Sequence, residues 1–130
     1  MKRFEERIAD FNNALNRLKE AVSSDKEPTE LEIDGTLQRF EFTFELAWKC
    51  MKDYLEKEGV SFSLGSPRDV IQNAFKYHLI DDGEAWIDMM LSRNDLSHLY
   101  DDAKSREIYE KIKGKYIGLL DVLIEKLKQE

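Results

Sequence analysis

The chain has 130 residues, of which 42% are hydrophobic and 36% are charged. That length allows one domain with its own core, and that composition excludes both a disordered tail and a membrane protein. The formal net charge of −7, from 20 basic and 27 acidic residues, argues against broad charge-driven binding to nucleic acid, although a local basic patch is compatible with it.

We expect a protein that is not exported. It begins MKRFEERIAD, with acidic residues where a signal peptide needs an apolar run. Cys50 is the single cysteine and cannot form an internal disulfide, which favours a reducing compartment. Because Cys50 lies in an apolar helical pattern, we interpret it as a core residue and not as a nucleophile. We expect one cytoplasmic domain that spans residues 1–130.

Apolar residues recur at helical spacing along nearly the whole chain. The first predicted helix spans about 2–23, and Pro28 blocks its continuation. The second spans about 29–57, with Gly59 expected as its C-cap. Its apolar stripe is widened by four further residues: Phe42, Leu46, Cys50 and Tyr54. We therefore expect this helix to be covered on more than one side, either as the central helix or at a contact with another subunit.

Three more helices are predicted after residue 60. Ser66 and Pro67 start a short helix that ends before residue 81, and the next helix spans about 84–96. The last helix runs from about residue 102 to the C-terminus, with Asp102 or Ser105 expected as its cap. The fold is therefore predicted to be all-α: an antiparallel up-and-down four-helix bundle with an additional short helix.

Polar and titratable residues crowd the junction between the last two predicted helices, at residues 92–102. Arg93 could hold a phosphate through paired hydrogen bonds, and His98 could move a proton near neutral pH. Together they suit RNA cleavage without metal, in which His98 deprotonates a ribose 2′-hydroxyl and Arg93 steadies the charge at phosphorus. One histidine supplies only the base or the acid, so two copies across a two-fold axis would supply both. The structural alternative is that Arg93 pairs with an acid and His98 caps a helix end.

Two acidic residues, Glu41 and Glu45, lie one helical turn apart in the apolar second helix. They either form a solvated stripe, with Glu45 paired to Lys49, or one of them reaches Arg93 and fixes it. A metal site formed by Glu41, Glu45 and His98 has no supporting spacing, so we expect no metal and no cofactor.

A basic run at residues 104–115 carries five positive and two negative charges. Lys104, Lys111 and Lys115 share one face of the predicted helix, which is either a solvated face or an RNA-binding track directly after the Arg93–His98 stretch. The other histidine, His78, is isolated in the sequence, and we interpret it as a surface or helix-capping residue.

Two stretches resemble a known family: RFEFTFELAWK at 39–49 and RNDLSHLYD at 93–101. They are similar to the nucleotidyltransferase substrate-binding protein family, a branch of the HEPN superfamily of small helical-bundle proteins. The second stretch has the R-x4-H-x-Y form of the HEPN motif, with Arg93, His98 and Tyr100 at its named positions. The resemblance covers nearly the whole chain in length and helix order.

The resemblance implies a cytoplasmic homodimer that assembles with a minimal nucleotidyltransferase. It implies a toxin–antitoxin system in which the HEPN protein is a metal-independent endoribonuclease with a cleft built from both subunits. Arg93 and His98 would be catalytic, and Tyr100 would receive AMP from the partner, which silences the RNase. Three residues are expected to support this site: Asn94, Glu41 and Glu45. The family's older name implies the alternative, a non-catalytic subunit that presents a substrate or nucleotide to the transferase.

Overall fold

The computed structural model describes residues 3–98 and 101–129. Six α-helices are linked by turns and by two short helical segments of other types, and the described residues contain no strand. The elements in chain order are α1 (Phe4–Ala21), α2 (Glu30–Lys57), α3 (Pro67–Lys76), α4 (Gly83–Asp95), the 3-10 turn η1 (Leu96–His98), α5 (Asp102–Lys111), the π-helical segment η2 (Ile112–Tyr116) and α6 (Ile117–Lys128). The predicted all-α fold is confirmed.

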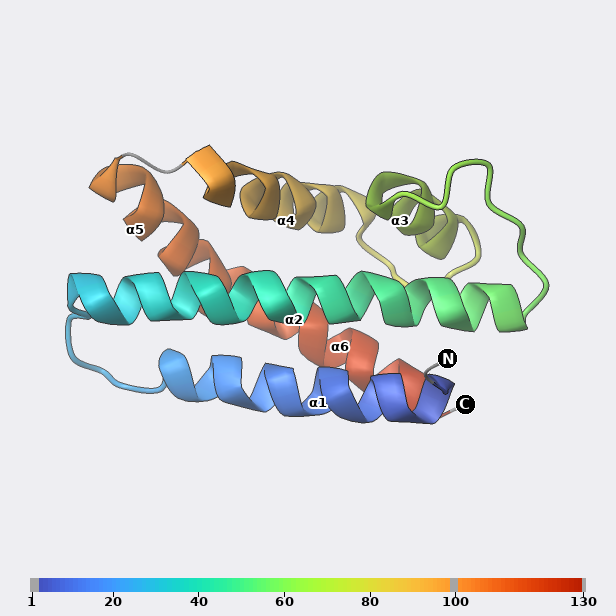
Figure 1. The fold of residues 1–130 in the computed structure, drawn as a ribbon, viewed down its shortest axis with the longest axis horizontal. Coiled ribbons are helices and arrows are strands. Elements are labelled where there is room, and N and C mark those ends of the chain that lie inside the picture. Colours follow the sequence, from blue (N-terminus) through green and yellow to red (C-terminus); the bar gives the residue numbers. More distant parts are fainter. Residues whose placement is uncertain (1–2, 99–100, 130) are drawn as a thin grey trace.

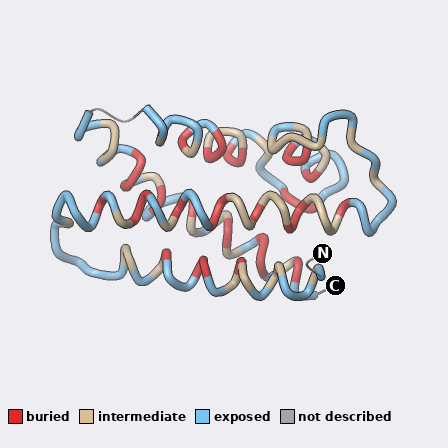
Figure 2. Tube along the Cα trace, viewed as in Figure 1, coloured by how far each residue is buried: buried red, intermediate tan, exposed pale blue. Residues whose placement is uncertain are grey.

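The helices form a bundle around α2, which runs the length of the molecule (Figure 1). The α1 helix lies beside α2, α3 and α4 follow one another along its other side, and the chain from α5 to α6 crosses the bundle as one continuous rod (Figure 1). Because α2 contacts α1, α3, α4, α5 and α6, it is covered on several sides, and buried residues recur along its whole length (Figure 2). None of the helices in the described part of the chain is long and apolar enough to cross a membrane.

Local capping chemistry sets the helix boundaries. Thr29 and Glu32 form a reciprocal capping box at the start of α2, with Thr29 Oγ1 accepting from the Glu32 amide and Glu32 Oε1 accepting from the Thr29 amide. Glu58, and not the predicted Gly59, is the C-cap of α2. Gly59 follows it with a φ of +92°, a conformation that favours glycine. Ser66 caps α3, and Pro67 occupies its first turn, as predicted.

The predicted cap of α5 also differs from the structure, whereas the place predicted for His78 is confirmed. Asp101, and not Asp102 or Ser105, caps α5, because its Oδ1 accepts from the Ala103 amide at 2.9 Å and the helix begins one residue later. His78 is exposed and takes a φ of 66° directly after the end of α3, where its amide donates to the carbonyl of Phe75. It is a surface residue at a helix terminus, as expected.

The core is aromatic at its centre. Phe40 and Phe44 of α2 are fully buried, with Phe40 stacked on Tyr116 at 5.5 Å between ring centroids and Phe44 near Trp86. Cys50 is also fully buried, and burial is the main cause that raises the pKa of its thiol to about 12. The thiol therefore stays protonated at neutral pH, which fits the core role predicted for it.

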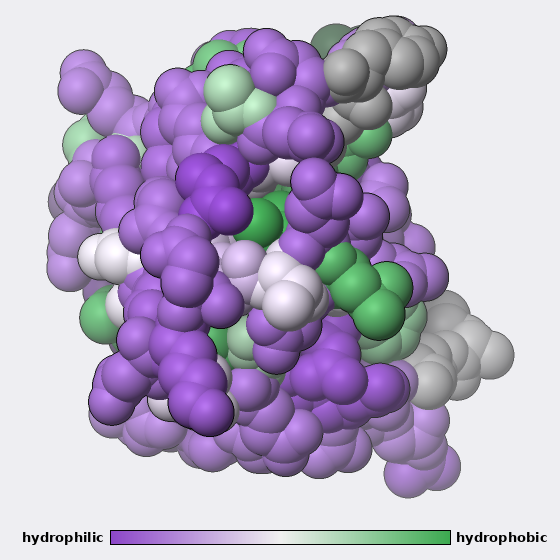
Figure 3. All heavy atoms as spheres, turned by 90° about the vertical axis from the view of Figure 1, so that its left-hand side faces the viewer, coloured by the Kyte–Doolittle hydropathy of each residue, from purple (hydrophilic) through white to green (hydrophobic). Residues whose placement is uncertain are grey.

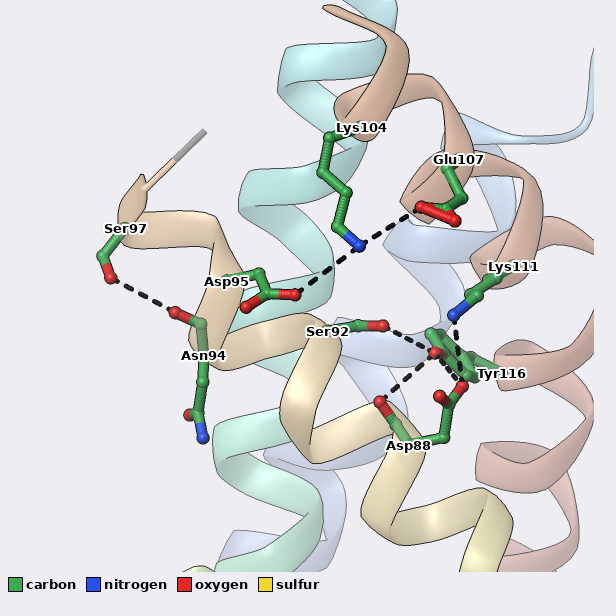
Figure 4. Close-up of polar contacts among 9 residues, drawn as sticks. All are labelled: Asp88, Ser92, Asn94, Asp95, Ser97, Lys104, Glu107, Lys111 and Tyr116. Carbon is green, nitrogen blue, oxygen red and sulfur yellow. Dashed lines mark hydrogen bonds and ion pairs between the residues drawn. The ribbon is translucent and has the colours of Figure 1, made fainter. Parts of the chain in front are cut away.

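A partly buried polar network ties α4 to the C-terminal rod (Figure 4). The Tyr116 hydroxyl donates to Asp88 Oδ2 at 2.6 Å and lies 2.7 Å from Ser92 Oγ, while Lys111 Nζ lies 3.5 Å from the same Asp88 oxygen. Tyr116 first, and the charge of Lys111 after it, hold the pKa of Asp88 below its ordinary value against the opposing effect of desolvation. The network brings polar partners to a tyrosine that is otherwise inside the core.

This network makes a pH-dependent contribution to stability. Because the pKa of Asp88 is lower in the folded state, its carboxylate stabilises the fold above the unfolded pKa of about 4, and this contribution is lost as the pH falls through the folded pKa. We expect Tyr116→Phe to lower the free energy of unfolding by about 1–3 kcal/mol at pH 7, and by less at acidic pH, in urea titrations.

Tyr109→Phe is the matched control for this experiment. Tyr109 is also buried, and its hydroxyl makes no hydrogen bond to the residues that the structure describes, so we expect a smaller change that does not depend on pH. An equal loss for Tyr116→Phe at pH 7 and at about pH 3 would contradict the role given to Asp88.

Candidate active site

The guanidinium of Arg93, in the last turn of α4, is held against α2. Its Nη2 donates to Oε2 of Glu45 at 2.5 Å, and the indole N–H of Trp48 donates to the same oxygen at 3.1 Å. The other oxygen of Glu45 lies 3.4 Å from Lys49 Nζ. The structure thus realises both sequence interpretations of Glu45, because it pairs with Lys49 and also reaches Arg93.

The helical spacing of α2 explains this cluster. Glu45, Trp48 and Lys49 lie three and four positions apart, so their side chains meet on one face of the helix. Phe44, next to Glu45, points into the core, and the Arg93 Cζ lies 6.0 Å from the centroid of its ring. Arg93 is therefore flanked by a carboxylate and an aromatic ring from the same turn of α2.

Arg93 remains accessible to a ligand. Its side chain is 25% exposed, and a guanidinium has five N–H groups, of which the contact with Glu45 uses one at Nη2. The remaining donors could bind a phosphate in the forked geometry that arginine favours. Glu45 also cancels part of the positive charge that a phosphate would meet, so it orients Arg93 while weakening its electrostatic attraction.

His98 lies on the surface at the end of η1, directly after α4. No hydrogen bond joins it to Arg93 within the described ranges, so the two side chains of one copy are neighbours in sequence but are not locked together. Asn94 is exposed, its side chain points away from the Tyr116 network, and its carbonyl accepts from Ser97 Oγ (Figure 4). Tyr100, the expected modification site, lies outside the described residues.

Glu41 does not join Arg93. It is exposed and lines a polar cavity of about 450 Å³ between α2 and the start of α5. Four acidic residues line this cavity: Asp34, Glu41, Asp101 and Asp102. Figure 3 views the end of the molecule that carries the starts of α2 and α5, and shows a mostly hydrophilic surface with a small apolar area in a central hollow. In the part of the chain that is described, no group of three or more His, Cys, Asp or Glu side chains is placed to hold a metal ion.

Two of the three lysines of the predicted RNA track, Lys104 and Lys111, face acids of α4 (Figure 4). Lys104 Nζ lies 3.2 Å from Glu107 and 3.8 Å from Asp95, and these contacts, with Glu107 first, raise its pKa. Lys111 pairs with Asp88, whereas Lys115 is exposed. Two of the three charges are thus partly neutralised, and this face is less basic than the sequence count indicates.

Two sets of side-chain contacts in this region were not predicted from the sequence. Trp48 was not connected with the site, although its position three residues after Glu45 is a signal that its N–H can reach that carboxylate. Asp88, Ser92 and Tyr116 were not linked, because residues 28 and 24 positions apart in the chain meet only through the packing of α4 on the C-terminal rod.

Comparison with known proteins agrees with this architecture. A Haemophilus influenzae protein named "Probable ribonuclease HepT" is 32% identical over 100 residues, which cover 75% of this chain and 68% of that protein. A Thermus thermophilus protein of known crystal structure superposes with a TM-score of 0.82 at 31% identity, over 91% of this chain and 98% of that one.

A second solved structure, from Haemophilus influenzae, is described as revealing the fold of a substrate binding domain of a nucleotidyltransferase. It superposes with a TM-score of 0.81 at 27% identity, over 94% of this chain and 99% of that one. Residues 6–129 match the family described as nucleotidyltransferase substrate binding protein like. With that match over nearly its whole length, and with the two stretches that carry the resemblance, the chain belongs to the nucleotidyltransferase substrate binding protein-like family.

Proposed function

We propose that this protein is a metal-independent endoribonuclease that acts as a homodimer. The observation that carries the proposal is the positioned guanidinium of Arg93, held by Glu45 and Trp48, five residues before the exposed His98. The intact R-x4-H-x-Y motif and a relative named as a probable ribonuclease support it. Because each copy has one histidine at this site, the cleft is completed by a second copy across a two-fold axis.

The reaction is a transesterification within the RNA chain. His98 of one copy takes the proton of a ribose 2′-hydroxyl, and the 2′-oxygen forms a bond to the adjacent phosphorus. The bond from phosphorus to the 5′-oxygen breaks, and that oxygen takes a proton from the imidazolium of the second copy. Arg93 donates hydrogen bonds to the phosphoryl oxygens as negative charge accumulates on them. The products are a 2′,3′-cyclic phosphate and a 5′-hydroxyl.

The partner in this proposal is a minimal nucleotidyltransferase that neutralises the RNase as an antitoxin. It transfers the adenylyl group of ATP to the phenolic oxygen of Tyr100, forming an O–P bond and releasing pyrophosphate. The added phosphodiester is an anion two residues from His98, where it would bind Arg93 in place of the RNA phosphate and fill the cleft. In this system the protein is a cytoplasmic toxin.

A second candidate function is a non-catalytic subunit that presents a substrate or nucleotide to the transferase. The description of the Haemophilus influenzae structure as a substrate binding domain favours it. The exposed apolar side chains of α2, of which Phe42 is the largest, would then serve assembly. This candidate predicts co-purification with the transferase and no RNA cleavage by the isolated protein.

Replacement of the histidine tests the nuclease. We expect His98→Ala to slow the cleavage of transfer RNA, followed on denaturing gels in the presence of a chelator, by about 10²- to 10⁴-fold. His78→Asn is the matched control, because it removes the other exposed histidine and asparagine tolerates the positive φ there. An unchanged rate in His98→Ala would exclude the histidine from the mechanism, and a wild-type protein without activity would favour the subunit candidate.

Replacement of the carboxylate tests the positioning of Arg93. Glu45→Gln frees the positive charge of Arg93 but loosens its position, so we expect kcat to fall about 10-fold while KM for RNA stays equal or falls. Trp48→Phe keeps the packing and removes one donor, and we expect a smaller fall in kcat. Glu41→Gln makes the same charge change one turn away and is expected to leave kcat unchanged. A rise in KM with unchanged kcat in Glu45→Gln would show that Glu45 does not position Arg93 for the reaction.

Mass spectrometry tests the proposed modification. After incubation with the partner transferase and ATP, we expect the wild-type chain to gain the mass of one or more adenylyl groups and to lose its RNase activity. Tyr100→Phe should show no gain, whereas Tyr77→Phe, which alters another exposed tyrosine, should gain mass as the wild type does. A gain that persists in Tyr100→Phe would place the modification elsewhere.

A further inference from the structure

One aromatic side chain of α2 faces solvent. Phe42 is 61% exposed, whereas Phe40 and Phe44 on the same helix are fully buried. A single exposed apolar side chain needs no explanation in itself. Phe42, however, lines a groove of about 770 Å³ along the seam where α1 lies beside α2 (Figure 1), so its ring borders a space large enough for a ligand.

Two arginines line the same groove. Arg17 of α1 is exposed, and Arg39 of α2 donates from Nη1 to the carbonyl oxygen of Arg17 at 2.6 Å. That bond fixes the guanidinium of Arg39 at the wall of the groove and leaves its other N–H groups for a ligand. Asn13 and Gln38 add amide groups, and Asp10 adds one acid. An aromatic face beside two guanidinium groups is the chemistry that binds a stacked base and its phosphate.

The groove lies next to the proposed cleavage site. Phe42 precedes Glu45 by three residues, so the two lie on the same side of α2. Gln38 lines both this groove and the acidic cavity whose walls include Leu96 and Asp101, on either side of His98. A single-stranded RNA that reaches Arg93 can therefore continue across α2 into the groove. The acidic residues of that cavity, which lies between Arg93 and the groove, repel phosphate. An RNA bound here would therefore be held at two separate points and not along a continuous basic track.

We propose that the α1–α2 groove binds one nucleotide of a single-stranded RNA substrate, with its base stacked on Phe42 and its phosphate at Arg17 and Arg39. The inference rests on RNA being the substrate proposed above. It assigns RNA binding to this groove in preference to the lysine face of α5, where Lys104 and Lys111 are already paired with acids.

The test uses a short single-stranded RNA with 2′-O-methyl groups at every position, which has no nucleophile and cannot be cleaved. Binding is measured by fluorescence anisotropy. We expect Phe42→Leu to weaken binding about 10-fold, because leucine keeps an apolar contact but lacks a ring face. Phe42→Trp should bind equally or more tightly. Phe75→Leu, which alters a half-exposed phenylalanine of α3, is the matched control and should bind as the wild type does.

The salt dependence tests the phosphate contact. Arg17→Gln should reduce the slope of log K against log salt by about 0.7, the value for one phosphate contact on a single strand. Arg68→Gln, an exposed arginine in the first turn of α3, makes the same charge change and should leave the slope unchanged.

Three results separate this inference from the proposed function. Wild-type binding by Phe42→Leu would overturn the inference, even if the wild-type protein cleaves RNA. RNA binding that depends on Phe42, together with no RNA cleavage by the wild type, would support RNA binding in the groove and contradict the proposed nuclease function. Conversion of a wild-type dimer to a monomer by Phe42→Leu, seen by light scattering at the same concentration, would assign the groove to a second copy of the chain and overturn the inference.

Discussion

The contact between Arg93 and Glu45 is the one on which the proposed chemistry depends, because it joins the last turn of α4 to the central helix of the bundle. The two side chains are 25% and 31% exposed, so the attraction between them is offset by the loss of hydration. The contact therefore adds little to the stability of the fold, and its main effect is to fix the position of the Arg93 guanidinium. Trp48 adds a donor to the same carboxylate oxygen, and the ring of Phe44 flanks the guanidinium. The helix that supplies more of the core than any other thus also positions the guanidinium to which we assign phosphate binding.

Arg93 and His98 differ in how firmly the fold holds them. Arg93 is held by a packed helix, whereas His98 stands on a three-residue turn at the surface. A proton-transfer group on such a turn needs further contacts to reach a productive geometry. A second copy of the chain or the RNA itself would supply them. If the protein is the dimeric RNase proposed above, a cleft that forms only on assembly would also be easily blocked by a bulky group.

The sequence predicts the helices well because their apolar spacing and their caps are local properties. It also predicts that a carboxylate in an apolar helix needs a partner, but it does not decide between Glu41 and Glu45, which have equivalent spacing. The packing of α4 on α2 makes that choice, since it places Arg93 beside Glu45 and leaves Glu41 at the acidic cavity. The π-helical segment Ile112–Tyr116 has no clear signal in the apolar pattern, yet it lies in the C-terminal rod where Tyr116 meets Asp88. The pairing of the lysine face could not be predicted for the same reason, because acids on another helix take part in it.

The charge distribution constrains how such a protein can act on RNA. The net charge is −7, an acidic cavity lies beside the motif, and two of the three lysines of the predicted RNA track are paired with acids, so the molecule has little long-range attraction for a polyanion. Its affinity must come from a few local contacts, in which a positioned guanidinium or an aromatic face meets one phosphate or one base. Such contacts favour a defined single-stranded segment over bulk RNA. If the protein is the dimeric RNase proposed above, we therefore expect it to select its substrate through these few contacts and not through its overall charge.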